Sequence, residues 1–161
     1  MKRKSFAQAR CPVARSLDSI GDWWTLLLIR DALRGPRRFS DFVESLGLAR
    51  NVLSARLRRL VEAGIFEQRP AEDGSDGLRY QLTEKGRGLQ VVIMALRQWG
   101  EDNLFGEGEE MSVQVDRAGG PIRRLIVQAT DGRPLRPEDV NIEPGHKRSR
   151  ARAAEAGPGS A

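Results

Sequence analysis

The segment from Arg50 to Gly64, RNVLSARLRRLVEAG, has the residue types and spacing of a helix that contacts nucleic acid. Three leucines recur in it at the three- and four-residue intervals of a buried helical stripe: Leu53, Leu57 and Leu60. On a helical wheel Asn51, Ser54 and Arg58 lie roughly opposite that stripe. Their amide, hydroxyl and guanidinium groups can bond to base edges in the major groove. We therefore predict that these three side chains contact bases of double-stranded DNA.

A second group of basic residues suits the phosphate backbone. The candidates are six arginines in or near this segment: Arg37, Arg38, Arg50, Arg59, Arg69 and Arg79. Residues 1–105 carry 18 Lys/Arg and 13 Asp/Glu, whereas residues 106–161 carry 9 of each, so the excess charge lies beside the predicted helix. Such a concentration is the electrostatic footprint of phosphate binding. Arg56 lies closer to the leucine stripe, and it is a candidate for an ion pair inside the domain.

Cys11 is the one residue whose chemistry could be redox-sensitive. It precedes Pro12 at the expected start of a helix, where the positive end of the helix and the neighbouring Arg10 favour a thiolate. A small buried thiol that fills space near the dimerisation helix is the competing interpretation, and both stay open. With one cysteine per chain, oxidation would give an intersubunit disulfide or a mixed disulfide with a small thiol.

The helices and strands that position these residues can be predicted from helix-capping residues and from the spacing of apolar residues. The pattern predicts helices over 11–20 and 23–34, a short helix capped by Ser40 and ending at Gly47, and the helix that closes at Gly64. Two strands, 65–69 and 78–82, then surround a Gly/Asp-rich tip as a β-hairpin wing. The predicted fold class is mainly α with this small wing, a winged helix-turn-helix.

A long helix from Glu84 to about Phe105, capped by Thr83, completes the predicted domain. It carries more apolar side chains than the core of so small a domain needs, and an exposed apolar stripe usually finds a partner. We therefore predict a homodimer, in which the contacts come from five residues of this helix: Leu89, Val92, Ile93, Leu96 and Trp99.

The remaining chain is expected to divide into an arm and an extension. Residues 1–10 are predicted to be a basic N-terminal arm, and 11–105 the DNA-binding and dimerisation domain. Residues 106–145 are predicted to form a short β-rich C-terminal extension with two strands, around Gly119-Gly120. Residues 146–161 are rich in Lys, Arg, Ala and Gly without periodicity, which predicts a disordered tail.

Composition argues against several other classes of protein. The longest apolar stretch is far too short to cross a bilayer, which favours a cytoplasmic protein with no membrane partner. One cysteine and one histidine cannot build a zinc cage, so no metal or cofactor is expected. No Ser/His/Asp set or phosphate-binding glycine loop is present, so the sequence does not predict an enzyme.

The order of these elements resembles the HxlR-type winged-helix transcriptional regulators, which are relatives of the MarR regulators. The resemblance covers about residues 11–105 and is carried by the following motifs: CPV at 11–13, LDSIG at 17–21, WTLLLI at 24–29, RFSDF at 38–42, LSARL at 53–57, LVEAG at 60–64, YQLTEKG at 80–86 and WG at 99–100. It implies a homodimer, usually a repressor, on a palindromic operator. It also implies that Cys11 matches a cysteine that senses oxidants or electrophiles in some members.

Three departures from the family pattern affect these expectations. Asp22-Trp23 stands where the family usually has a small residue and a lysine, which removes one basic contact. The wing tip carries Glu72, Asp73 and Asp76, which phosphate repels, so deep insertion of the wing is not expected. Residues 112–145 contain no cysteine, whereas some relatives have a zinc-ribbon-like extension with paired cysteines.

Two alternatives stay open on the sequence. The winged helix could be a protein-interaction module whose basic face binds an acidic protein. A small-molecule effector is a further candidate partner, since Trp23, Trp24 and Trp99 could frame an aromatic pocket between the second helix and the long helix. Large aromatic residues at helical spacing are more often part of the core.

Overall fold

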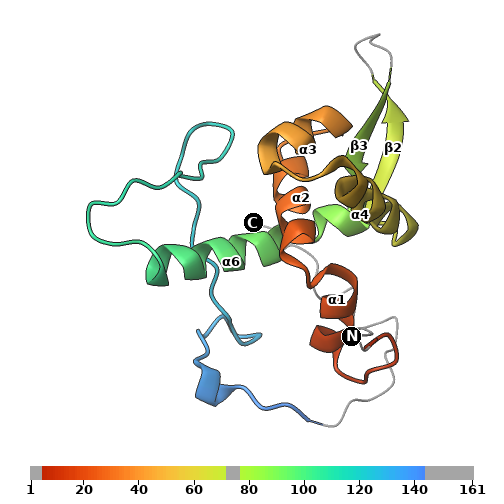
Figure 1. The fold of residues 1–161 in the computed structure, drawn as a ribbon. Coiled ribbons are helices and arrows are strands. Elements are labelled where there is room, and N and C mark those ends of the chain that lie inside the picture. Colours follow the sequence, from red (N-terminus) through yellow and green to blue (C-terminus); the bar gives the residue numbers. More distant parts are fainter. Residues whose placement is uncertain (1–4, 72–76, 144–161) are drawn as a thin grey trace. The chain divides into compact units, whose positions relative to one another are not determined.

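The computed structural model describes residues 5–71 and 77–143. Its elements are α1 (Pro12–Ile20), α2 (Trp23–Ala32), β1 (Arg37–Arg38), α3 (Phe39–Leu46), α4 (Arg50–Glu62), β2 (Phe66–Pro70), β3 (Leu78–Leu82), α5 (Glu84–Arg87), α6 (Gln90–Asn103) and the 3-10 turn η1 (Pro137–Asp139). The expected acidic wing tip and disordered tail lie outside the described residues, as do residues 1–4 of the expected arm. The mainly α fold with a small wing, a winged helix-turn-helix, is confirmed (Figure 1).

The core forms where α2, α3 and α4 pack against the sheet. The three leucines of the predicted stripe, Leu53, Leu57 and Leu60, are buried there. Phe42 of α3 is fully buried and contacts the rings of Phe66 on β2 and Tyr80 on β3 edge-on, with centroids 6.2 and 6.4 Å away. Burying such side chains stabilises the fold by about 1.5–3 kcal/mol each. The leucine stripe and Phe42 therefore fix α4 and the wing on one core.

The turn after α4 sets the direction of the wing. Gly64 has φ of 67°, the left-handed conformation that was predicted for it. The N–H of Gly64 donates to the carbonyl of Val61, and the N–H of Ile65 donates to that of Leu60, each at 2.9 Å. This pair of bonds is a Schellman motif, which ends the helix and leads the chain directly into β2.

The sheet has three strands rather than the two of the predicted hairpin. β1 pairs antiparallel with β3, and the strand order is β1-β3-β2. The predicted Ser40 cap of α3 is wrong because β1 continues to Arg38, and the helix begins at once with Phe39. The carboxylate of Asp41 accepts the N–H of Arg38 at 2.8 Å and satisfies the first turn instead.

The predicted single helix over 84–105 is interrupted. Thr83 caps α5 as expected, since its hydroxyl accepts the N–H of Gly86 at 3.1 Å. A break at Gly88 and Leu89 then separates α5 from α6. Gly86 is buried where a Cβ atom would lie 2.2 Å from the carbonyl oxygen of Ile65. The glycines let α5 pack closely against the wing but weaken a continuous helix.

The predicted β-rich extension is wrong for the described residues 106–143, which contain two isolated bridges, Val115–Pro121 and Gln128–Pro134, in place of strands. Proline lacks the N–H that a continuing ladder requires. The described residues divide into two compact units, one that ends at Leu125 and one that begins at Ile126. Within the first unit, the side chain of Gln98 on α6 accepts the N–H of Leu125 at 2.9 Å and donates to its carbonyl at 3.0 Å.

Candidate nucleic-acid interface

The outward face of α4 carries all three predicted base-edge residues. Asn51, Ser54 and Arg58 are exposed, as are the flanking Arg50 and Arg59. The carbonyl oxygen of the Asn51 side chain accepts the N–H of Val52 at 2.9 Å, one of the donors that the helix start leaves without a helical partner. The leucine stripe on the opposite side holds this polar face toward solvent, which is the arrangement a groove-entering helix requires.

Arg56 belongs to the interior side of α4, and its predicted ion pair is present. Its guanidinium contacts the carboxylate of Asp22, at the N-terminus of α2. Asp22 also caps α2, since its two carboxylate oxygens accept the N–H of Thr25 at 3.1 Å and the Thr25 hydroxyl at 2.6 Å. Asp22 thus ties the start of α2 to the middle of α4.

The environment of Asp22 favours its charged form. Burial raises the pKa of this carboxyl, but the hydrogen bonds from Thr25 and the positive charge of Arg56 together outweigh burial and hold its pKa below the ordinary value. From the sequence, Asp22 is expected to mark the start of the second helix and the loss of a basic contact, but not to bind α4. The signal that could have revealed its role is the Asp-x-x-Thr spacing at a helix start.

The sheet places three arginines side by side, one on each strand. Arg79 on β3 is directly opposite Arg38 on β1 and Arg69 on β2. Directly opposite residues project from the same face of a sheet, on strands about 4.8 Å apart. We call Arg38, Arg79 and Arg69 the arginine row. The row gathers three guanidinium groups on one face of the sheet, and such a cluster of positive charge suits a polyanion.

Among the predicted phosphate residues, Arg69 and Arg37 are held by contacts within the domain. The guanidinium of Arg69 pairs with the carboxylate of Glu67 at 3.1 Å. Hydrogen bonds from Gln81 and Arg69 lower the pKa of Glu67, so this partner stays ionised. The Nε of Arg37 donates to the carbonyl of Asp31 at 3.2 Å, which holds Arg37 toward α2 rather than beside the arginine row.

The arginine row and α4 belong to the same end of the domain. β2 contacts α4 directly, and Figure 1 shows the wing strands beside α4, with α6 extending away on the other side of α2. Base-edge candidates on a helix therefore stand next to backbone candidates on a sheet. This combination of an exposed polar helix and a basic wing defines a winged helix-turn-helix DNA-binding domain.

The remaining predicted site residues lie elsewhere. Cys11 is exposed at the start of α1, and its side chain makes no capping bond. Trp23 and Trp24 contact each other, with ring centroids 4.7 Å apart. A cleft does lie between α2 and α6, but none of the three tryptophans lines it, so the expected aromatic frame is wrong for the described residues.

The five predicted dimerisation residues divide between two sides of the helical region. Leu89 and Ile93 are half-buried and pack on the core of the domain itself. Val92, Leu96 and Trp99 are exposed, by up to 57% for Trp99. α6 therefore has one apolar side that docks it to its own domain and another that faces outward.

The chain belongs to the HxlR-like helix-turn-helix family, whose model matches residues 19–107. An uncharacterized HTH-type transcriptional regulator of Mycobacterium tuberculosis H37Rv is 37% identical over 134 residues, 83% of this chain and 85% of the relative. The crystal structure of PA1607 is 50% identical, with a TM-score of 0.81 over 87% of this chain and 99% of that one. The redox regulator HypR in its reduced form is 31% identical, with a TM-score of 0.53 over 58% of this chain and 93% of that one.

These findings make the protein a helix-turn-helix transcriptional regulator, a class of DNA-binding proteins without enzymatic activity. In the part of the chain that the structure describes, no helix has both the length and the apolar character to cross a membrane.

Replacing Asp22 by asparagine should remove the part of the free energy of unfolding that depends on ionisation of this carboxyl. A carboxyl whose folded pKa is depressed stabilises the fold above its unfolded pKa, and this contribution is lost as the pH falls through the folded pKa. We expect the wild type to lose stability as the pH falls below about 4, the ordinary range of aspartate. Asparagine keeps a capping oxygen but loses the ion pair with Arg56, so Asp22→Asn should lose up to about 1 kcal/mol at neutral pH and show a flatter acid limb.

The measurement is urea unfolding followed by circular dichroism between pH 3 and 7. Glu44→Gln, the same loss of charge at an exposed carboxylate on α3, is the matched control. Equal acid limbs for wild type and Asp22→Asn would show that this carboxylate does not hold α2 and α4 together.

Proposed function

We propose that the protein is a homodimeric, sequence-specific repressor that binds a palindromic operator through α4 and the wing sheet. The observation that carries this function is the exposed polar face of α4 beside the arginine row. The alternative, a module for an acidic protein partner, needs the same charge but gives no reason for an amide, a hydroxyl and a guanidinium on one helix face.

The division of labour follows from the chemistry of each group. Arg58 can donate two hydrogen bonds to the O6 and N7 atoms of a guanine, and Asn51 can pair with the N6 and N7 atoms of an adenine. The arginine row, with Arg50 and Arg59, contributes charge to the backbone, which fixes the register of α4 but does not discriminate bases.

The exposed apolar side of α6 supports the proposed dimer. Val92, Leu96 and Trp99 expose large apolar surfaces there, and Val13 and Leu17 do so on α1. A two-fold contact through such a surface is self-complementary and needs no other partner. It would place two copies of α4 in successive major grooves, roughly 34–36 Å apart. A shift of either helix would break that match, which makes the dimer a natural point of regulation.

Arg58→Ala tests the base-reading role. We expect operator affinity to fall by about 1–3 kcal/mol and specificity to relax at one base position of each half-site, because a bidentate contact to one base is lost. The measurement is fluorescence anisotropy on an operator selected from genomic fragments and on its single-base variants. Arg123→Ala, an exposed arginine outside the wing and α4, is the control. If Arg58→Ala keeps the base preference of the wild type, Arg58 does not contact a base edge.

Trp99→Glu tests the dimer contact. A charge in the centre of an apolar interface is strongly unfavourable, so we expect this variant to sediment as a monomer and to lose most of its operator affinity. Trp99 is more than half exposed within its own chain, and the variant should therefore keep the wild-type circular dichroism. Ile142→Glu places the same charge at a fully exposed site and should leave the dimer intact. A dimeric Trp99→Glu would exclude this surface.

Cys11→Ser tests redox control. The exposure of Cys11 and the existence of reduced and oxidised forms of HypR support the proposal that oxidation regulates this chain. Two thiols, one from each subunit, would lose two electrons and two protons to an oxidant and form a disulfide. We expect diamide to alter operator binding by the wild type but not by Cys11→Ser, measured by anisotropy before and after reduction. An equal response of both proteins to diamide would exclude redox control through Cys11.

A further inference from the structure

A cleft of about 1070 Å³ lies between α2 and α6, and no residue of α4 lines it. Most of its walls come from α2 and the turn after it, from the start and middle of α6, and from residues 112–115 and 122. A few positions on α3, β3 and α5 complete the lining, and all of it lies within the first compact unit. Ligand sites for small organic molecules usually occupy about 300–1,000 Å³, so the volume suits one such molecule. The arginine row and the exposed face of α4 take no part in the cleft, and DNA binding leaves it unexplained.

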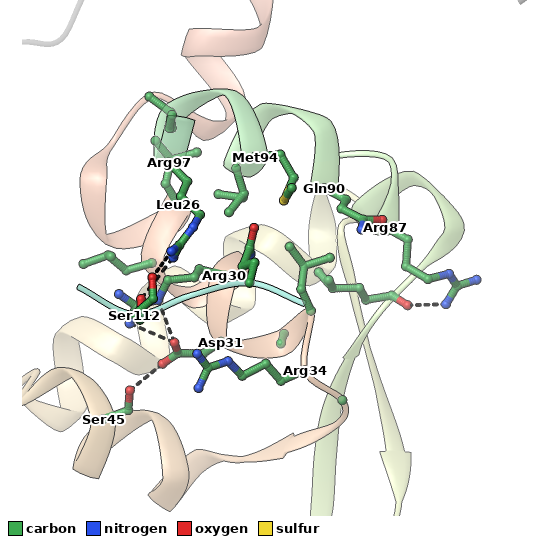
Figure 2. Close-up of a pocket in the computed structure, with 18 of the residues that line it drawn as sticks. Leu26, Arg30, Asp31, Arg34, Ser45, Arg87, Gln90, Met94, Arg97 and Ser112 are labelled. Atoms are coloured by element: carbon green, nitrogen blue, oxygen red, sulfur yellow. Dashed lines mark hydrogen bonds and ion pairs between the residues drawn. The ribbon is translucent and has the colours of Figure 1, made fainter. Parts of the chain in front are cut away.

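Much of the lining of the cleft is apolar. The side chains come from both helices and from the segment that follows them: Leu26, Leu27, Leu33, Ile93, Met94 and Ile122. Figure 2 shows Leu26 and Met94 facing the cleft from α2 and α6. Met adapts its shape to irregular ligands, and these walls favour a hydrocarbon or aromatic body.

The charged lining is mainly positive. Among the described residues around the cleft, four are arginines, Arg30, Arg34, Arg87 and Arg97, and one is a carboxylate, Asp31. Arg30, Arg34 and Arg97 lie toward the end marked by Asp31 and Ser112, and Arg87 lies at the other end (Figure 2). A cleft with apolar walls and a cationic end attracts a ligand with one anionic head.

Part of this positive charge is already compensated. Arg30 pairs with Asp31 at 2.8 Å, and Asp31 also accepts the hydroxyl of Ser45 at 2.5 Å. Arg97 pairs with Glu101 at 2.6 Å and donates to the hydroxyl of Ser112 at 3.0 Å. These bonds hold both guanidinium groups in place, which lowers the entropic cost of binding an anion between them.

Arg34 differs from the other arginines at this end of the cleft. In the described ranges 5–71 and 77–143, no carboxylate lies within ion-pair distance of Arg34. It lies just beyond the C-cap residue of α2, Leu33, and Gly35 then turns the chain away with φ of 129°. Arg34 therefore brings an uncompensated positive charge beside two guanidinium groups that are held by bonds of their own.

We propose that the cleft binds a small amphipathic carboxylate, with the carboxylate on Arg34 beside Arg30 and the apolar body between Leu27 and Met94. A guanidinium accepts a carboxylate through two parallel hydrogen bonds, which fixes the orientation of the head. The proposal deepens the proposed function, on which its regulatory part rests: the molecule is an effector of operator binding.

The position of the cleft explains how an effector would act. The walls include α2, which Asp22 connects to α4, and α6, which carries the exposed apolar surface of Leu96 and Trp99. A ligand between α2 and α6 changes the relative energies of their packings and biases the separation of the two DNA-reading helices.

The test is calorimetric titration of the full chain, without DNA, with naphthalene-2-carboxylate and with octanoate. We expect saturable binding of at least one, and binding weakened tenfold or more for the uncharged analogue, naphthalene-2-methanol or octanol. Arg34→Gln should weaken binding by about tenfold or more, because a charge-assisted bond is lost. Arg123→Gln, on the segment after α6 but outside the cleft, should bind as the wild type does.

A second variant tests the apolar wall of the cleft independently of its arginine end. Met94→Glu puts a negative charge on the apolar wall, and it should abolish binding while the circular dichroism and sedimentation stay unchanged. Failure of both carboxylates to bind, equal binding of the neutral analogues, or wild-type affinity in Arg34→Gln would each overturn the site.

The regulatory part is measured separately, by operator anisotropy with and without the carboxylate that binds. A changed affinity in the wild type that is absent in Arg34→Gln supports an effector. An operator affinity that does not change, although carboxylate binding has been measured, overturns the regulatory role. Failure of the ligand-free wild type to bind any operator contradicts the proposed function itself.

Discussion

The burial of one face of α4 is the constraint on which the rest of the structure depends. Leu53, Leu57 and Leu60 can leave water only if α2, α3 and the sheet cover them, and this burial forces the opposite face of α4 outward. The Schellman turn at Gly64 then starts the wing next to the same helix end. One apolar stripe therefore places both the base-edge candidates and the arginine row, although no residue of the stripe contacts DNA in the proposed complex.

Local signals were sufficient for the elements nearest to this constraint. The leucine spacing predicted α4, Gly64 predicted its end, and the Gly/Asp-rich tip between two strand-like segments predicted β3 with the bounds that the structure gives. The base-edge face of α4 was predictable for the same reason, because a helical period fixes which residues oppose a buried stripe. The exposure of Asn51, Ser54 and Arg58 is therefore a property of the sequence pattern itself.

Non-local contacts explain what the sequence did not reveal. β1 is two residues long, and it exists only because Arg37 and Arg38 pair with Tyr80 and Arg79, far along the chain. The break before α6 lies at Gly88 and Leu89, just after the close approach of Gly86 to Ile65, and no helical period encodes either feature. The capping carboxylate of Asp22 meets Arg56 only after α2 and α4 have packed, so its second role could not be inferred from its neighbours in sequence.

The arginines show how one residue type takes different roles according to its partners. Arg56 and Arg97 are compensated by carboxylates in the domain, and they fasten α4 to α2 and α6 to the segment after it. Arg58 projects into solvent on α4, where its positive charge suits a polyanion. Net charge alone does not distinguish these roles, because a compensated guanidinium stabilises a fold and an uncompensated one attracts a ligand. Arg34 is of the second kind yet lies away from α4, and this is why a small anion, rather than DNA, suits its position.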